Sequence, residues 1–335
     1  MKNLLYIGNR LSKHGITPTT IETLGPLLEQ EGFKVQYSSS QKNQILRMMV
    51  MLWSVCRYRS VDYVLIDTYS TANFWYAFAT SQLCRFLRIK YIPILHGGNL
   101  PFRLKKNPRV CKMIFAPSFQ NVAPSLFLVS KFKAEGYSNV IHIPNAIELK
   151  NYPFLERETA TPHLLWVRSF ATIYNPTMAV EVFANLKKIY PEATLCMVGP
   201  EKDGSLLKTK QRAHELKVEV TFTDKLSKQD WIDLSKNYSV FINTTHFDNM
   251  PVSLIEAMSL GLAIVSTNVG GIPFLIEDEK DGLLVPDSDV EKMVTAIDRL
   301  LQNKGLFTVI TTNARMKSEQ FGWNKIKQEW ITILK

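Results

Sequence analysis

The sequence predicts an α/β protein with two domains, each built around a parallel β-sheet. Short β-branched or aromatic runs alternate with longer amphipathic stretches, which is the pattern of strands joined by helices. The length of 335 residues is ordinary for two domains, and 46% hydrophobic against 21% charged residues exclude a chain that is disordered throughout. A polar, proline-rich stretch near the middle, 143–162, separates two similar halves of this pattern.

Ten short runs are predicted to be strands. In the first half they are 4–8, 34–38, 63–67, 91–95 and 126–130, and in the second half 164–168, 194–198, 240–243, 263–266 and 282–285. Helices are expected between them. The clearest spans 176–190, because Pro176 suits a first helical position and the apolar residues that follow recur at helical spacing.

The predicted domain boundary lies in the proline-rich stretch. Pro144, Pro153 and Pro162 interrupt any regular element there, which places one domain at 1–145 and a second at 146–319. Ligands of parallel sheets bind at the carboxyl ends of the strands. Two such sheets facing each other therefore predict a site in a cleft between the domains.

The cysteines and the apolar segments indicate the cellular compartment. The four cysteines lie far apart without a CxxC pair, which argues against a disulfide scaffold or a zinc knuckle and fits a reducing compartment. The apolar run at the N-terminus is too short for a signal peptide. The longest apolar candidate for a membrane span, 72–95, is interrupted by Arg85, Arg88 and Lys90. We therefore expect a cytoplasmic protein.

Positive charge is concentrated in the first half of the chain. Residues 1–150 contain 19 Lys and Arg against seven Asp and Glu, a balance of +12, whereas the remainder has a balance of −2. This asymmetry favours an anionic partner for the first domain only, either nucleic acid or an anionic membrane. No nucleic-acid motif is present, so no nucleic-acid partner is expected.

Two segments of the first domain favour the membrane. The stretch 41–59 combines bulky apolar residues with basic ones, and a second basic cluster lies at 103–112. A helix of this kind beside a basic patch predicts interfacial binding to anionic lipid, and a buried core helix is the alternative. The residues expected at the membrane or acceptor are Arg47, Trp53, Arg57, Arg59, Arg103, Lys105 and Lys106.

The densest chemical signal is FDNMPVSLIEAMSLGLAIVSTNVGGIPFLIEDEKDGLLVP at 247–286. Asp248 lies in a predicted loop, and Glu256 follows eight residues later on a helix that Pro251 opens. The helix start around Pro251 to Ser253 offers free backbone N–H groups and a positive dipole end, which suit a diphosphate. Carboxylates on either side could accept hydrogen bonds from sugar hydroxyls.

This segment resembles the E-x7-E signature of family-4 retaining glycosyltransferases (glycosyl transferases group 1), with Asp248 in place of the first Glu. EAMSLGLAIVSTNVGGIP is similar to the helix and turn that follow in that family. The likeness continues at Gly15, LHGG (95–98), PNAIEL, Arg168, VGP (198–200) and the C-terminal FGWNKIKQEWITIL. It therefore covers nearly the whole chain.

The resemblance implies the GT-B fold, with two Rossmann-like domains and a C-terminal helix, 320–335, that returns to the first. It also implies retaining transfer from a nucleotide-sugar donor, with a UDP-sugar expected, to a glycan or lipid-linked acceptor. The setting would be surface polysaccharide biosynthesis at the inner face of the plasma membrane. No cofactor and no metal are expected. The alternatives are a GT-B sugar-nucleotide epimerase and a sugar-nucleotide-binding partner protein without turnover.

The resemblance also assigns roles to individual residues. Glu256 would hold the ribose hydroxyls, Asp248 would face the donor sugar and Arg168 would bind the diphosphate. His96 would lie near the sugar and the acceptor. The other expected donor-binding residues are Gly15, Asn175, Gly199, Asn249, Met250, Pro251, Val252 and Ser253. Taken singly, Glu256 could be a solvated surface acid, Arg168 a surface ion pair and His96 a structural histidine.

Three departures from the family pattern stand out. A Lys expected shortly after Arg168 is missing, because Ile173 and Tyr174 occupy that place, and Lys202 or Lys13 would have to substitute. Phe274 stands where the family has Glu after GGIP, and Asp248 is one methylene shorter than Glu. The DSD at 287–289 resembles a metal-binding DxD, but its position before a helix predicts an N-cap.

Overall fold

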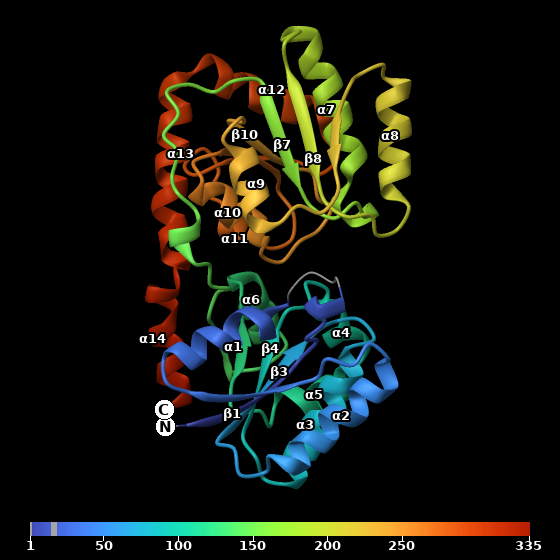
Figure 1. Cartoon of the computed structure of the whole chain (residues 1–335), viewed down its shortest axis with the longest axis vertical. Coiled ribbons are helices and arrows are strands. Elements are labelled where there is room, and N and C mark those ends of the chain that lie inside the picture. The colour runs from blue at the N-terminus through green and yellow to red at the C-terminus, as the bar shows by residue number, and fades with distance from the viewer. Residues whose placement is uncertain (1, 15–18) are drawn as a thin grey trace. The chain divides into compact units, whose positions relative to one another are not determined.

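The computed structural model describes residues 2–14 and 19–335 (Figure 1). The chain divides into two compact units. Unit 1 comprises Met1–Ala146 and Trp323–Lys335, and unit 2 comprises Ile147–Gly322. Each unit contains one six-stranded sheet in which neighbouring strands run parallel. The predicted α/β fold class is confirmed.

The sheet of unit 1 has the strand order β2-β1-β3-β4-β5-β6. Its strands are β1 (Asn3–Ile7), β2 (Lys34–Ser38), β3 (Tyr63–Thr68), β4 (Tyr91–Leu95), β5 (Asn121–Ala123) and β6 (Val140–His142). Every residue of the central strands β3 and β4 is buried. Burial on both faces is typical of a parallel sheet covered by helices on each side.

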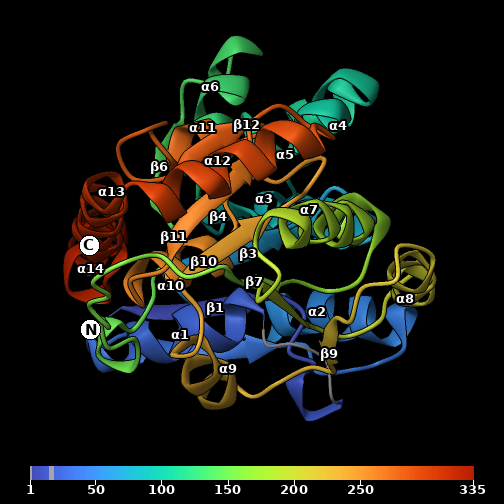
Figure 2. The same cartoon turned by 90° about the horizontal axis from the view of Figure 1, so that it is seen from above.

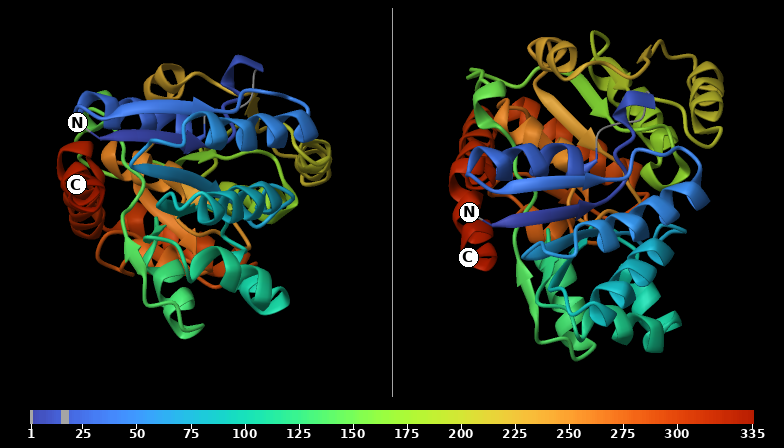
Figure 3. Two further views of the ribbon diagram at one scale, coloured as in Figure 1. Left: turned by 90° about the horizontal axis from the view of Figure 1, so that it is seen from below. Right: turned by 60° about the horizontal axis from the view of Figure 1, so that its bottom comes forward.

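The helices of unit 1 cover this sheet. They are the 3-10 turn η1 (Ser12–His14), and α1 (Thr20–Gln30), α2 (Gln44–Arg57), α3 (Phe74–Phe86), α4 (Leu100–Lys106), α5 (Pro108–Phe115), α6 (Leu126–Ala134) and α14 (Trp323–Leu334). Met51 of α2 and Ala77 of α3 share one hydrophobic core with Leu5 of β1, so these two helices pack on the same face of the sheet. Helix α14 lies beside the end of α1 (Figure 3). There Glu31 accepts hydrogen bonds from Trp323 Nε1 at 3.1 Å and Lys327 Nζ at 3.1 Å.

The sheet of unit 2 has the order β12-β11-β10-β7-β8-β9 (Figure 2). Its strands are β7 (His163–Val167), β8 (Thr194–Val198), β9 (Thr221–Thr223), β10 (Val240–Asn243), β11 (Ala263–Thr267) and β12 (Leu283–Val285). Leu164 and Trp166 of β7 pack into one hydrophobic core, and Leu165 packs into another. The alternation of side chains along the strand thus builds a core on each face.

The helices of unit 2 complete these two cores. They are η2 (Leu149–Asn151), η3 (Thr172–Tyr174), α7 (Pro176–Ile189), α8 (Ser205–Glu215), α9 (Lys228–Ser235), α10 (Val252–Ser259), α11 (Ile272–Leu275), α12 (Val290–Gln302), α13 (Lys304–Ser318) and η4 (Glu319–Phe321). Residues of α7 and α12 belong to the core of Trp166, and residues of α10 belong to the core of Leu165. In the described part of the chain, no helix is both long and apolar enough to cross a membrane.

One predicted strand is wrong, and three short strands were not predicted. Residues 126–130 begin helix α6, because the Ser125 side chain accepts a hydrogen bond from the amide of Leu128 and so caps a helix there. An apolar run of this length fits a strand and a buried helix equally well. Strands β5, β6 and β9 have only three residues each, too few to show the alternation from which strands are recognised.

Candidate active site

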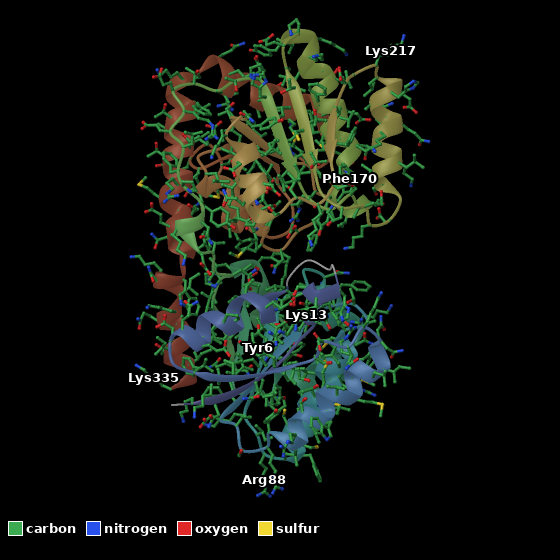
Figure 4. The ribbon with its side chains drawn as sticks, viewed as in Figure 1. Tyr6, Lys13, Arg88, Phe170, Lys217 and Lys335 are labelled. Atoms are coloured by element: carbon green, nitrogen blue, oxygen red, sulfur yellow. The ribbon has the colours of Figure 1, made fainter. Side chains whose placement is uncertain are left out.

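The candidate site in unit 2 begins where β7 and β8 end. The amide of Arg168 donates to Val198 O at 3.0 Å, and the amide of Phe170 donates to Pro200 O at 2.8 Å. Figure 4 shows Phe170 at this end of the sheet. A Cβ atom on Gly199 would lie 1.8 Å from Arg168 O, so only glycine allows the two loops to approach so closely. The fold therefore brings the predicted residues Arg168 and Gly199 together.

Arg168 forms an ion pair with Asp248, so the predicted phosphate-binding cation and the predicted sugar-binding acid are in contact. Their side chains are 14% and 16% exposed. The guanidinium also lies over the ring of Tyr174, 4.2 Å from its centroid, and burial lowers the pKa of Arg168. Among the described residues, the buried Nε of Arg168 has no hydrogen-bond partner. Tyr174, which stands where the family has a lysine, thus packs its ring against the Arg168 guanidinium.

Two glycines shape the loop that carries Asp248. The amide of Gly271 donates to Asp248 O at 2.8 Å. A Cβ atom on Gly270 would lie 2.2 Å from Asp248 O, and one on Gly271 would lie 1.8 Å from Asn249 O. The Asn249 amide closes the loop by donating to Asp248 Oδ1 at 2.7 Å. The Gly-Gly turn therefore acts on the site through the backbone that it supports.

Helix α10 starts at this loop. Pro251 is its N-cap, so the amides of Val252 and Ser253 belong to the first helical turn, where no earlier carbonyl accepts from them. Met250 and Asn249, which precede it, are buried. The buried Oγ of Ser253 has no hydrogen-bond partner within residues 2–14 and 19–335. This helix start thus presents unused donors beside Asp248.

Glu256 lies one turn further along α10 and is only 5% exposed, so it is not a solvated surface acid. Its Oε1 accepts a hydrogen bond from the Tyr152 hydroxyl at 2.7 Å and one from Lys228 Nζ. Burial and the neighbouring carboxylate raise the pKa of Tyr152, which keeps its hydroxyl a donor. Neither Tyr152 nor Lys228 was predicted, because neither lies near Glu256 in sequence and neither belongs to a motif.

In unit 1, His96 follows β4 and contacts a buried acid. Its Nε2 lies 2.8 Å from Oδ1 of Asp67, a fully buried residue of β3 that also accepts from the Tyr6 hydroxyl at 3.0 Å. His96 Nδ1 lies 3.4 Å from Thr20 Oγ1. Figure 4 shows Tyr6 among the strands of this unit. Asp67 was not predicted, since a single acid within a strand carries no sequence signal. The predicted Gly15 lies outside the described residues.

Other predicted residues have structural contacts of their own. Asn175 adopts a left-handed conformation with φ 45° at the N-cap of α7, and its carbonyl accepts from Thr244 Oγ1 at 2.9 Å. Lys202 is exposed on the loop after β8. Asp289 accepts from the amide of Lys292 at 2.9 Å, so the DSD segment provides the predicted N-cap.

The predicted membrane residues divide into two groups. Trp53 is 61% exposed, and Arg57, Arg59, Lys105 and Lys106 are also exposed. Two others contradict the expectation that they lie on the surface.

Arg47 is buried, and its Nη1 donates to Gln41 O at 3.2 Å, because a short loop folds back over it. Arg103 is half-buried, donates to Ser70 O at 2.7 Å and stacks over Phe74. Both therefore stabilise loops of unit 1.

The family model described as glycosyl transferases group 1 matches residues 152–317. The chain is 30% identical over 213 residues to an uncharacterized glycosyltransferase of Haemophilus influenzae, covering 61% of this chain and 56% of that protein. It is 22% identical over 203 residues to the Escherichia coli UDP-Gal:alpha-D-GlcNAc-diphosphoundecaprenol alpha-1,3-galactosyltransferase, covering 56% of this chain and 51% of that protein. The aligned part thus spans about half the length of these two relatives.

Solved structures agree with the fold over nearly the whole chain. Sucrose-phosphate synthase from Thermosynechococcus elongatus is similar with a TM-score of 0.81 at 15% identity, covering 99% of this chain and 98% of that one. HepE of Anabaena, in complex with UDP-glucose, is similar with a TM-score of 0.79 at 15% identity, covering 100% and 99%. These likenesses show the GT-B fold. The matched segment contains Arg168, Asp248 and Glu256, so residues 152–317 match the family described as glycosyl transferases group 1.

Proposed function

We propose that this protein is a retaining glycosyltransferase that moves a sugar from a UDP-sugar to a glycan or lipid-linked acceptor in surface polysaccharide biosynthesis. The family match over residues 152–317 supports sugar transfer. The printed names of similar proteins support the donor and the setting. HepE has been crystallised with UDP and UDP-glucose, and two relatives are named for the biosynthesis of colanic acid and amylovoran.

One observation carries the proposal. Arg168 Nε and Ser253 Oγ are both buried without a hydrogen-bond partner in the described part of the chain. Arg168 forms an ion pair with Asp248, and Ser253 follows Asp248 closely in the sequence. Buried polar groups in native proteins are normally satisfied, so unpartnered ones call for a ligand. The phosphate oxygens of a nucleoside diphosphate would accept from both groups and from the first amides of α10.

The same residues account for the chemistry. Departure of a nucleoside diphosphate needs stabilisation of the negative charge on its phosphates, which a guanidinium and a helix start supply without a metal. A bound diphosphate would compete with Asp248 for Arg168 and free that carboxylate to accept sugar hydroxyls. A phosphate oxygen of the donor would help to remove the acceptor's proton. Transfer is therefore expected to persist in EDTA.

The test is a panel of nucleotide sugars, measured first by thermal shift and then by hydrolysis and transfer. We expect a UDP-sugar to raise the melting temperature of the wild-type protein and to be turned over. Arg168→Ala should weaken UDP binding about 10- to 100-fold, as expected for a lost hydrogen-bonded charge. The matched control is Arg299→Ala, which breaks the exposed ion pair with Glu279 and should leave binding unchanged.

Other results would exclude the proposal. Interconversion of free sugar nucleotides without an acceptor would indicate an epimerase. Binding without any turnover would indicate a partner protein that only holds the nucleotide. Equal UDP affinity in Arg168→Ala and wild type would remove this site from donor binding.

We also propose that the protein is cytoplasmic and associates with the anionic inner face of the plasma membrane through α2 and α4 of unit 1. Helix α2 buries Met51 and Val55 in the core but exposes Ile45, Leu46, Met49 and Trp53. Exposed Arg57 and Arg59 follow at its end, and exposed Phe102 lies with Lys105 and Lys106 on α4. Apolar residues beside basic ones suit the boundary between lipid headgroups and acyl chains.

A further inference from the structure

The side chains of Tyr152 and Lys228 both contact the Glu256 carboxylate. Tyr152 follows the turn η2, and Lys228 is the first residue of α9. Tyr152 is buried, whereas the Lys228 side chain is 55% exposed. Lys228 Nζ also lies over the Tyr152 ring, 5.9 Å from its centroid. The three residues come from three separate elements and meet at one carboxylate.

Tyr152 is held against α10 at two points. Its hydroxyl donates to Glu256, and its backbone carbonyl accepts from Arg315 Nη1 at 3.1 Å. The same Nη1 donates to Ser259 O, at the end of α10, at 2.7 Å. Tyr152 also packs in the hydrophobic core that contains Leu254 of that helix. The phenol is therefore fixed relative to the helix that carries Glu256.

The two contacts involve only one of the two oxygens of the Glu256 carboxylate. Both hydrogen bonds found among residues 2–14 and 19–335 end on Oε1, and none ends on Oε2. Burying a carboxyl group is costly unless donors or an opposite charge contact it, and here a hydroxyl and an ammonium do so. The orientation of the group is then fixed by these partners, as at sites where neighbouring groups orient a ligand-binding side chain.

We infer that Tyr152 and Lys228 are positioning residues of the donor site, which hold Glu256 by Oε1 so that Oε2 accepts a hydrogen bond from a ribose hydroxyl of the nucleoside diphosphate. The inference rests on the proposed function, which places the ribose at Glu256. Tyr152 fixes the orientation of the carboxylate, because its hydroxyl is buried and held in place. Lys228 adds a positive charge beside the same oxygen, which its ammonium reaches from an exposed position.

The experiment compares UDP with 2′-deoxy-UDP and 3′-deoxy-UDP by calorimetric titration. Wild type should prefer UDP to at least one deoxy analogue. Tyr152→Phe keeps the ring and removes only the donor, so it should weaken UDP binding about tenfold, the loss expected for one hydrogen bond near a charge. Its affinity for that deoxy analogue should stay the same. A purely structural role would weaken both ligands equally.

Lys228 provides a second variant that does not disturb the core. Lys228→Met should reduce the preference for UDP over the same analogue, and Lys228→Arg should restore it. The matched control is Lys236→Met, because Lys236 forms an exposed ion pair with Asp233 near the end of the same helix. This control should bind all three ligands as wild type does.

Glu256→Gln separates failure of the inference from failure of the proposed function. If Glu256→Gln retains wild-type preference for the ribose, the carboxylate does not bind the sugar and the proposed donor site is wrong. If Glu256→Gln loses the preference while Tyr152→Phe and Lys228→Met both keep it, the donor site stands and the positioning roles are wrong. Loss of the preference in all three variants supports both.

Discussion

The contact with Asp67 determines which ring nitrogen of His96 carries the proton. The carboxylate is fully buried, with its Oδ1 shared between His96 Nε2 and the Tyr6 hydroxyl. Burial and the charge of Asp67 raise the pKa of Tyr6, so the phenol remains a donor. A carboxylate accepts only, so the imidazole must carry its proton on Nε2 when it contacts Asp67. The free acceptor of a neutral His96 is then Nδ1, on the side of Thr20.

This pairing predicts the effect of Asp67→Asn. The amide can donate to Nε2 and so favour the other tautomer, which places the proton on Nδ1. If His96 accepts a hydrogen bond or proton during transfer, kcat at saturating donor should fall ~10²-fold or more, with UDP affinity unchanged. Asp62→Asn, which affects a half-buried ion pair with Lys2, is the control. An unchanged kcat in a folded Asp67→Asn protein would make His96 a structural residue.

The residues of the candidate site could be predicted only where they belong to a motif. Asp248, Glu256 and Arg168 stand at recognisable positions, and the structure brings Arg168 and Asp248 together. Tyr152 lies 104 residues from its partner Glu256. Lys228 lies 28 residues from it, and Asp67 lies 29 residues from His96. Such contacts depend on how strands and helices pack, and nothing in the local sequence indicates them.

At the scale of elements, the Gly270–Gly271 turn supports the Asp248 loop by close backbone packing. Gly271→Ala should therefore displace that loop, because the new Cβ would lie 1.8 Å from Asn249 O. We expect a loss of about 1–3 kcal/mol in the free energy of unfolding, as for other overpacked sites, together with weaker UDP binding. Thermal unfolding and calorimetry measure the two effects.

Gly305→Ala is the matched control for this substitution. Gly305 lies in α13, and its nearest neighbour, the Asn303 side chain, would be at an ordinary 3.4 Å from the new Cβ. Alanine is favoured over glycine in a helix, so this variant should be neutral or slightly stabilised. Wild-type stability in Gly271→Ala would show that the loop adapts without cost.

The elements themselves could largely be predicted, because most strands show clear apolar runs and most helices have recognisable starts. The segment 126–130 is an exception, because it is helical although its apolar run also fits a strand. Leu126 is exposed while Phe127 and Leu128 are buried, a pattern set by the helix that the Ser125 cap begins. The four apolar residues at 126–129 contain no such distinction when read as sequence alone.

The charge asymmetry between the two halves of the chain predicts membrane binding through unit 1. The protein should co-sediment with anionic vesicles but not with zwitterionic ones, and high salt should release it only partly, because salt does not screen the apolar contribution of Trp53. Each basic residue near an anionic surface contributes about 1 kcal/mol, so Arg57→Glu with Arg59→Glu should reduce binding at least about tenfold.

Charge reversal in unit 2 is the control for this experiment. Lys208→Glu with Lys210→Glu alters exposed residues of α8 by the same total charge and should leave vesicle binding intact. UDP binding should be unaffected in both double variants. A wild-type protein that ignores anionic vesicles and binds nucleic acid tightly would contradict the membrane assignment and favour a soluble acceptor.

The position of α14 has a consequence for biosynthesis. Its residues Trp323, Ile326, Trp330 and Leu334 are buried and belong to unit 1, although they follow the whole of unit 2 in the chain. Unit 2 is continuous and can fold as soon as it leaves the ribosome. Unit 1 must wait, with the surface that α14 covers still open to water, until residues 323–335 have been translated. The half of the protein that is made first is therefore the half that is completed last.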